Sequence, residues 1–177
     1  EGVLGNPSGP GGVGGFSGGD VTNEAWRLDL ATLRSGGMPA RITARYDHAC
    51  CSVRGSLVVI GGQTTSDYFM PSSSVETFSS GQGAFVELPP LSCGGIRGAA
   101  AIAVEESDSA AGQVLLLGGV MQGVPVSTVH LVDLATGVCT PGRPDLLGSR
   151  YSSAVSALPG GRIVCAGGYS GVPQSSA

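Results

Sequence analysis

Lysine is absent from this 177-residue sequence, and charged residues of all kinds make up 12% of it. The nine basic residues are all arginines, they are scattered along the chain, and the net charge is −4. A nucleic-acid-binding protein normally carries a basic patch or stripe, so the charge pattern argues against that class. No apolar run approaches the roughly 20 residues that a membrane-spanning helix needs, so no membrane partner is expected.

Aromatic residues are scarce, at 5%, and the five cysteines contain no C-x-x-C pair that would indicate a zinc or redox motif. Four of the cysteines lie in or next to apolar runs, where a free cysteine acts as a small hydrophobic residue. This pattern favours a reduced, cytoplasmic protein over a secreted one. The sequence opens at Glu1 without a methionine, which suggests a piece of a longer chain, so the lack of a targeting signal decides nothing.

Glycine is abundant instead, with 31 residues, and its pairs mark an internal repeat. An apolar run that stops at a double glycine occurs at Ser56–Gly62, Val114–Gly119 and Arg162–Gly168. The double glycines that we assign to the repeat are Gly14-Gly15, Gly61-Gly62, Gly118-Gly119 and Gly167-Gly168, and they stand 47, 57 and 49 residues apart. Intervals of this size are typical of propeller blades rather than of helical solenoids.

Two further markers keep the same spacing. Asp29 and Asp133 each follow the second glycine of a pair by 14 residues, at the end of an alternating run that predicts a half-buried strand and an Asx turn. Arg45, Arg97 and Arg150, which are 52 and 53 residues apart, each open a run of small residues. Small side chains along a whole strand indicate backbones that crowd together, as at the centre of a radial array.

Each unit is therefore predicted to contain four short strands, and no stretch has the caps and 3.6-residue period of a convincing helix. The fold class is predicted to be all-β. The predicted units are a Gly/Pro-rich N-terminal stretch at 1–10, the second half of a unit at 11–44, full units at 45–92 and 93–149, and the first half of a unit at 150–177.

The double glycine, the Asp turn and the arginine before a small-residue strand resemble the kelch repeat, and Arg45-x-x-His48 matches the Arg-x-x-His of many kelch units. The resemblance implies a partial kelch-type β-propeller with about three blades of four antiparallel strands. Propellers close with about four to eight blades, so the remaining blades are expected to be absent from this chain, with closure by a second copy as the alternative. Two positions depart from the kelch pattern. The aromatic position before the turn aspartate holds Leu28, Phe78 and Val132, and the position of the later tryptophan holds Ser35, Phe85 and Cys139.

The resemblance also implies a function, a non-catalytic module for protein–protein interaction, which recognises substrates for a larger protein such as a ubiquitin-ligase adaptor. In kelch proteins the binding face contains the loops after the double glycines and the approach to the small-residue strand. A protein partner with an acidic or phosphorylated segment suits the arginines there, although each arginine could instead tie one blade to the next through backbone carbonyls. The candidate binding residues are Arg45, Tyr46, Gln63, Arg97, Gln122, Arg150, Tyr151 and Tyr169.

Catalytic motifs are weak in this sequence. Gly15–Gly19 fits G-x-S-x-G and Gly9–Gly14 fits G-x-G-x-x-G, but both lie in a glycine-rich stretch that lacks the strand–turn–helix context these motifs need. His48 and His130 have no third ligand at a suitable spacing, so no metal or other cofactor is expected. A protein without enzymatic activity is therefore predicted. The alternatives are a propeller enzyme that acts on sugars or other small molecules, and a structural role in homotypic assembly.

Overall fold

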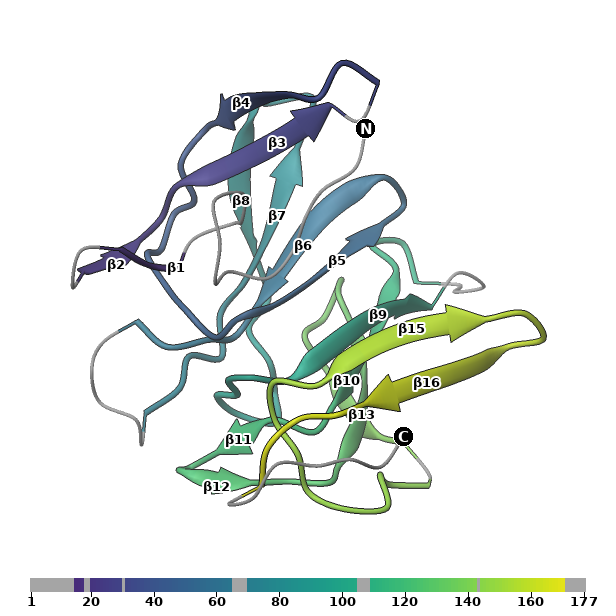
Figure 1. The fold of residues 1–177 in the computed structure, drawn as a ribbon. Helices are drawn as coiled ribbons and strands as arrows, with labels where there is room; N and C mark the ends of the chain where they lie inside the picture. The colour runs from purple at the N-terminus through teal and green to yellow at the C-terminus, as the bar shows by residue number, and fades with distance from the viewer. Residues whose placement is uncertain are drawn as a thin grey trace.

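The computed structural model describes residues 15–17, 20–29, 31–64, 70–104, 109–142 and 144–170. The predicted N-terminal stretch at 1–10 and Gly14 lie outside these residues. All of the regular structure within them is β, in sixteen strands that pair antiparallel, and they contain no helix (Figure 1). The predicted all-β class is confirmed. Nor does this part of the chain hold a helix of the length and apolar character that a membrane span requires.

Two four-stranded sheets form the middle of the chain. One has the order β5-β6-β7-β8 and the other has the order β9-β10-β13-β14. The strands of the first are β5 (Ala49–Val53), β6 (Ser56–Ile60), β7 (Val75–Ser79) and β8 (Ala84–Leu88). Those of the second are β9 (Ala100–Val104), β10 (Gln113–Leu117), β13 (Val129–Asp133) and β14 (Cys139–Pro141).

Two-stranded sheets flank this pair along the chain. β3 (Ala25–Asp29) pairs with β4 (Arg34–Met38), and β15 (Ala154–Leu158) pairs with β16 (Arg162–Ala166). By their markers, β3 and β4 correspond to the last two strands of a unit, and β15 and β16 to the first two. Two short hairpins complete the list: β1 (Gly15–Ser17) with β2 (Asp20–Thr22), and β11 (Val120–Met121) with β12 (Val124–Pro125).

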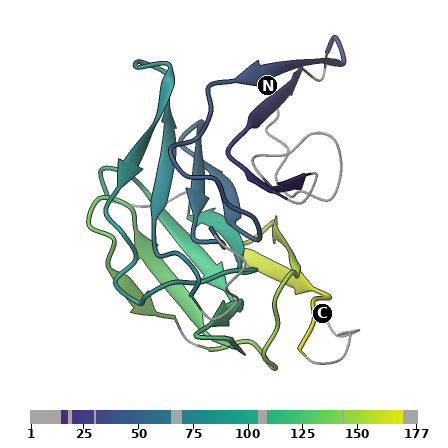
Figure 2. The same ribbon diagram turned by 90° about the vertical axis from the view of Figure 1, so that its left-hand side faces the viewer.

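The sheets fan around a common side, where their small-residue strands lie next to one another (Figures 1 and 2). β5 contacts β9, and β9 contacts β15. The sheets do not close into a ring, so the described residues form the partial propeller that the sequence predicts.

The continuous apolar run of β6 follows from its place between two cores. Side chains alternate between the faces of a strand. Val58 and Ile60 pack into a core shared with the sheet that contains β10, whereas Leu57 and Val59 pack into a core shared with the β3–β4 sheet. Because both faces of β6 are covered, an alternating apolar–polar pattern would bury polar groups there.

Successive sheets are joined by a repeated backbone hydrogen bond. In three of the four pairs, the second glycine donates its N–H to a carbonyl at the start of the next unit. Gly15 bonds to Arg45 at 3.0 Å, Gly62 to Ile96 at 2.8 Å, and Gly119 to Arg150 at 2.7 Å. A second series runs nearer the centre, where Gly98 N–H donates to the Asp47 carbonyl at 2.6 Å and Ser152 N–H donates to the Gly98 carbonyl at 2.7 Å.

The first glycine is needed for the same close approach in two of the pairs, Gly61-Gly62 and Gly118-Gly119. Gly61 and Gly118 have left-handed φ angles of 64° and 63°, and a Cβ atom would lie 2.2 Å from the Ile96 carbonyl oxygen and 2.3 Å from that of Arg150. Gly167 has nearly the same conformation, with φ of 70°, but a Cβ there would meet nothing within 4 Å. The double glycine is thus required by the following sheet as well as by the local turn.

Substitution by alanine should separate these two requirements. Gly167→Ala should cost about 1–2 kcal/mol, the usual penalty of a left-handed non-glycine residue. Gly118→Ala should cost about 1–3 kcal/mol more, because its methyl group also clashes with the backbone of the next sheet. Urea unfolding of both variants measures the difference, and equal losses of unfolding free energy would show that the sheet contact does not constrain Gly118.

Candidate functional site

The residues that follow the double glycines pair with the residues that precede the small-residue strands. Isolated antiparallel bridges join Tyr46 to Gln63, Arg97 to Val120, and Tyr151 to Tyr169. These three bridges occupy the same place in three successive units, at the end of the sheets where the post-glycine loops emerge. We call this the loop end, defined by the six bridged residues, and it contains or adjoins most of the predicted binding residues.

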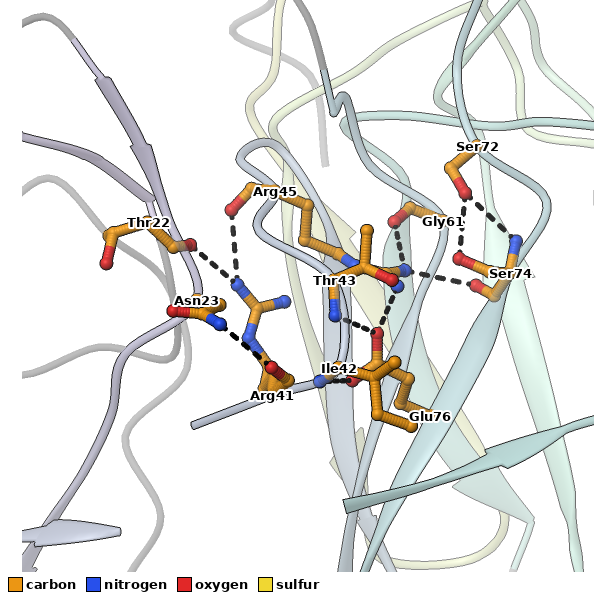
Figure 3. A network of polar contacts seen from close by, with 10 residues as sticks. All are labelled: Thr22, Asn23, Arg41, Ile42, Thr43, Arg45, Gly61, Ser72, Ser74 and Glu76. Atoms are coloured by element: carbon orange, nitrogen blue, oxygen red, sulfur yellow. Dashed lines mark hydrogen bonds and ion pairs between the residues drawn. The ribbon is translucent and has the colours of Figure 1, made fainter. Parts of the chain in front are cut away.

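Arg45 lies beside the loop end but is fully buried (Figure 3). Its Nη1 donates to the carbonyl oxygens of Gly61 at 2.8 Å and Ser74 at 3.2 Å, and its Nη2 forms an ion pair with Glu76. Burial lowers the pKa of the guanidinium, and the Glu76 carboxylate opposes that shift. These partners all lie in the unit to which Arg45 belongs, so its side chain braces its own sheet rather than tying one blade to the next. Its complete burial argues against direct contact with a partner.

Glu76, on β7, is the acidic half of this buried pair and has no exposed surface. Its carboxylate also accepts the backbone N–H groups of Ile42 at 3.0 Å and Thr43 at 3.2 Å. A buried charge is tolerated when hydrogen bonds and an opposite charge surround it. Glu76 therefore holds the segment that enters β5 against the sheet to which β7 belongs.

Arg41 extends the network toward the β3–β4 sheet (Figure 3). Its Nη2 donates to the carbonyl oxygens of Thr22 at 3.1 Å and Arg45 at 3.3 Å, while Asn23 donates its side-chain N–H to the Arg41 carbonyl at 3.0 Å. Burial and the nearby Arg45 charge lower the pKa of Arg41 to about 10, so the side chain stays charged at neutral pH.

Sequence reasoning missed both Arg41 and Glu76. Leu91 takes the place of Arg41 in the next unit. The backbone N–H of Arg41 donates to the Asn23 carbonyl, and the backbone N–H of Leu91 donates to the Ser73 carbonyl in the same way. His130 takes the place of Glu76. In the sheet register His130 lies opposite Leu116 and Glu76 lies opposite Val59, and Leu116 and Val59 both stand two residues before a double glycine. Neither position is repeated, so the repeat pattern holds no signal for them. For Glu76, the sequence offers one indication, which is that a charged residue interrupts the strand-like run Val75–Ser79.

Arg150 repeats the arrangement of Arg45. It is 5% exposed, its Nη1 donates to the Gly167 carbonyl at 3.1 Å, and its Nε donates to the Gly148 carbonyl at 3.4 Å. In the unit between them, the carbonyl that meets the second glycine belongs to Ile96, so Ile96 takes the place of the arginine.

Arg97 is therefore displaced by one residue from the predicted alignment. Its bridge to Val120 places it with Tyr46 and Tyr151, not with Arg45 and Arg150. The near-equal spacings of 52 and 53 residues do not reveal this shift in register, because loop lengths also contribute to the spacing. The backbone bridges fix the register independently of loop length.

This displacement places the largely buried side chain of Arg97 beside Tyr151 and near the exposed edge of the loop end. Its Nη1 lies 3.1 Å from the Asp47 carboxylate, and its side chain and that of Asp47 are 12% and 38% exposed. The guanidinium carbon is 5.9 Å from the centre of the Tyr151 ring, within the range of a cation–π contact. Tyr151 meets Tyr169 edge to face, with ring centres 5.5 Å apart, and Tyr169 is 40% exposed. Asp47, Arg97, Tyr151 and Tyr169 form what we call the Arg97 patch.

The other predicted binding residues are not part of this patch. Gln63 is fully buried, with its side-chain N–H 3.5 Å from the Met70 carbonyl. Tyr46 is half-buried in the bridge to Gln63. Gln122 is exposed at the tip of the β11–β12 hairpin, with a left-handed φ of 49°.

The repeated aspartates lie at the opposite end of the sheets and form identical turns. Asp29 Oδ1 accepts the N–H groups of Ala31 at 2.9 Å and Thr32 at 2.8 Å. Asp133 Oδ1 accepts those of Ala135 and Thr136 at 2.9 and 3.0 Å. These hydrogen bonds favour the ionised carboxylate, and the pKa is lowered at Asp29, mainly by Thr32, and at Asp133, mainly by the Ser109 hydroxyl.

No metal-binding cluster of three or more His, Cys, Asp or Glu side chains occurs among the residues with a described position. His48 is buried just before β5, and His130 is half-buried on β13, where burial lowers its pKa. Gly18 and Gly19 of the G-x-S-x-G match, and all of the G-x-G-x-x-G match, lie outside the described residues.

Comparison with protein families agrees with this repeated, open all-β arrangement. Residues 44–92, which contain β5 to β8 and the Arg45–Glu76 pair, match the kelch motif. The chain therefore carries a kelch repeat, and the predicted resemblance to the kelch-repeat family is confirmed. Kelch repeats commonly mediate protein interactions. The search of curated proteins found no match to this chain.

The buried ion pair predicts an asymmetric response to two similar substitutions. Glu76→Gln leaves the Arg45 charge buried without its counter-charge and should cost about 3–5 kcal/mol of unfolding free energy. Glu87→Gln is the matched control, because Glu87 faces Glu76 across the β7–β8 pairing but is exposed. It should change stability by less than about 0.5 kcal/mol. Chemical denaturation of both variants measures this, and a Glu76→Gln protein as stable as the control would contradict the assignment.

Proposed function

We propose that this chain is a kelch-repeat module that binds another protein through its loop end. The observation that carries the proposal is the Arg97 patch, in which Arg97 contacts Tyr151 of the neighbouring unit and Tyr151 contacts Tyr169, which is 40% exposed. Arginine and tyrosine are enriched among the residues that dominate the energy of protein interfaces. Their position beside the post-glycine loops supports the same face that the kelch resemblance implies.

The patch is held in shape before any partner binds. Backbone hydrogen bonds of 3.0 and 2.9 Å join Tyr151 and Tyr169, and bonds of 3.2 and 2.8 Å join Arg97 and Val120. Edge-to-face packing further limits the rotation of the two tyrosine rings. Less side-chain entropy is then lost on binding, which favours affinity at a given contact area.

The predicted binding residues divide into two groups by burial. Arg45, Arg150 and Gln63 are buried, and we assign them to bracing the units in which they lie. Arg97, Tyr151 and Tyr169 form the contact surface in this proposal, with Tyr46 and Gln122 at its margin. The substrate-recognition part of a larger protein, such as a ubiquitin-ligase adaptor, is one setting for such a surface.

An acidic or phosphorylated segment is the partner chemistry that we propose for the patch. Arg97 is paired with Asp47, whose side chain is 38% exposed, and ion pairs that reach solvent contribute little stability. A phosphate group offers Arg97 more charge and several acceptor oxygens, so it can compete for the guanidinium. The tyrosines add apolar contact to the residues that flank the phosphate.

Charge reversal within the patch tests this function. Binding of fluorescein-labelled phosphoserine peptides with acidic flanks is followed by fluorescence anisotropy. Arg97→Glu should weaken binding by about 30-fold or more, as expected for loss of an interface hot spot. Arg162→Glu is the matched control, because Arg162 is exposed at the start of β16, at the end of the strand opposite Tyr169. It should leave the affinity within about twofold of the unchanged protein.

Melting temperatures of the two variants are measured as well, because Arg97→Glu places a carboxylate beside Asp47, and binding is compared at a temperature where both variants are folded. Equal loss of binding in both variants would contradict a specific role for Arg97 and indicate a general effect of charge. Failure of the unchanged chain to bind any acidic or phosphorylated peptide would contradict the proposed partner chemistry. Binding to an array of sugars instead would favour the alternative of a propeller enzyme.

A further inference from the structure

Two cysteines that are far apart in the sequence meet at one point of the fold. The Sγ atoms of Cys93 and Cys139 lie 2.7 Å apart, although 46 positions separate the residues. Cys93 is in the linker between β8 and β9, and Cys139 is the first residue of β14. Unbonded sulfur atoms rarely approach so closely, and a disulfide bond would need a small further approach, to about 2.05 Å.

Backbone contacts hold the two segments together on either side of the thiols. Ser92 N–H donates to the Gly137 carbonyl at 2.9 Å, and Cys139 N–H donates to the Ser92 hydroxyl oxygen at 2.9 Å. Gly137 has a φ of 74°, and a Cβ there would lie 2.2 Å from the Pro90 carbonyl oxygen. The linker is thus seated on the turn before β14 by contacts that do not involve sulfur, which positions the thiols in advance.

The register of the sheets explains why a small residue at position 139 leaves room for Cys93. Cys139 is paired with Val132 as Phe85 is paired with Phe78 in the preceding sheet. Phe78 and Phe85 pack edge to face there, with ring centres 5.4 Å apart. Position 139 lacks such a ring, and Cys93 and Cys139 together pack against the core instead.

We propose that Cys93 and Cys139 are a redox-active pair that forms a disulfide bond and fastens the linker to the outermost strand of the following sheet. The oxidant is a low-molecular-weight disulfide, RSSR. One protein thiolate attacks RSSR, forms a mixed disulfide and releases RS⁻. The other protein thiolate then attacks the protein sulfur of the mixed disulfide and releases the second RS⁻. In sum, two protein thiols and RSSR give one protein disulfide and two RSH, so the protein loses two electrons and two protons.

The surroundings of the pair set the rate of this reaction. Burial and the hydrogen bond to Cys139 raise the pKa of Cys93 to about 12. The thiolate is the attacking species, so the reaction should be slow at neutral pH and should accelerate as pH rises from 7 to 9. Once formed, the bond closes a loop over the 46-position separation, which restricts the unfolded chain more than the folded one.

Peptide mapping tests the bond directly, because cleavage after arginine separates the relevant cysteines. Cys93 lies in peptide 55–97 and Cys139 in peptide 98–150, since the Arg143–Pro144 bond resists trypsin. Cys50 and Cys51 share peptide 46–54, and Cys165 lies in peptide 163–177. The chain is incubated with glutathione disulfide, alkylated and digested without reductant. The expected product is peptide 55–97 joined to peptide 98–150. Before digestion, the melting temperature of the oxidised chain should be about 5–15 °C higher than that of the reduced chain.

Two variants and one control make the test specific. Cys93→Ser and Cys139→Ser should each lose the joined peptide and the oxidant-dependent rise in melting temperature, whereas Cys165→Ser should keep both. Alkylation of both peptides 55–97 and 98–150 after oxidation would overturn the proposal. So would a product in which either is joined mainly to peptide 46–54 or 163–177. This proposal does not depend on the protein-binding function, and failure of either leaves the other standing.

Discussion

The backbone hydrogen bond from the second glycine of each pair to the following unit is the contact on which the rest of the structure depends. It brings two sheets together through main-chain atoms, so a side chain on the first glycine would interfere with the approach, whereas one on the second would meet the residues before the small-residue strand of its own unit. Gly15, Gly62 and Gly119 make the same bond at three successive junctions. Because this contact sets the position of each small-residue strand, it also sets which residues emerge at the loop end. The Arg97 patch therefore follows from the packing of the sheets.

The side chains next to this junction differ from one repeat to the next. Arg45 and Arg150 both donate to the carbonyl of the first glycine, at Gly61 and Gly167. Ile96 stands in that place at the remaining junction and is buried among apolar residues instead. The buried charge of Arg45 further requires Glu76, whereas an apolar residue needs no such partner. One backbone geometry is thus compatible with two kinds of core, and this explains how the repeats diverge in sequence without losing the fold.

Much of the fold could be predicted from the sequence because backbone constraints repeat. The double glycines and the aspartate turns act locally, so their signal survives in each unit, and the kelch motif at 44–92 agrees with it. The boundaries of the repeat units stay a prediction. The site could be predicted less well. Arg97 was aligned with Arg45 by spacing, but the loop lengths that enter the spacing vary.

Pairs that join distant positions were beyond reach of the sequence for a different reason. Glu76 meets Arg45 across 31 positions, and Cys93 meets Cys139 across 46, and neither pair recurs in another unit. A single sequence records such partners only through the three-dimensional register that brings them together.

Amide hydrogen exchange at the sheet junctions tests the central claim most directly. The N–H groups of Gly62, Gly98, Gly119 and Ser152 each bond to a carbonyl of a neighbouring unit. If these bonds hold the propeller segment together, the four amides should exchange only with unfolding of the segment, and with similar opening free energies. Exchange as fast as that of exposed turn amides such as Gly160, while the strand amides of β6 and β10 stay protected, would contradict this account.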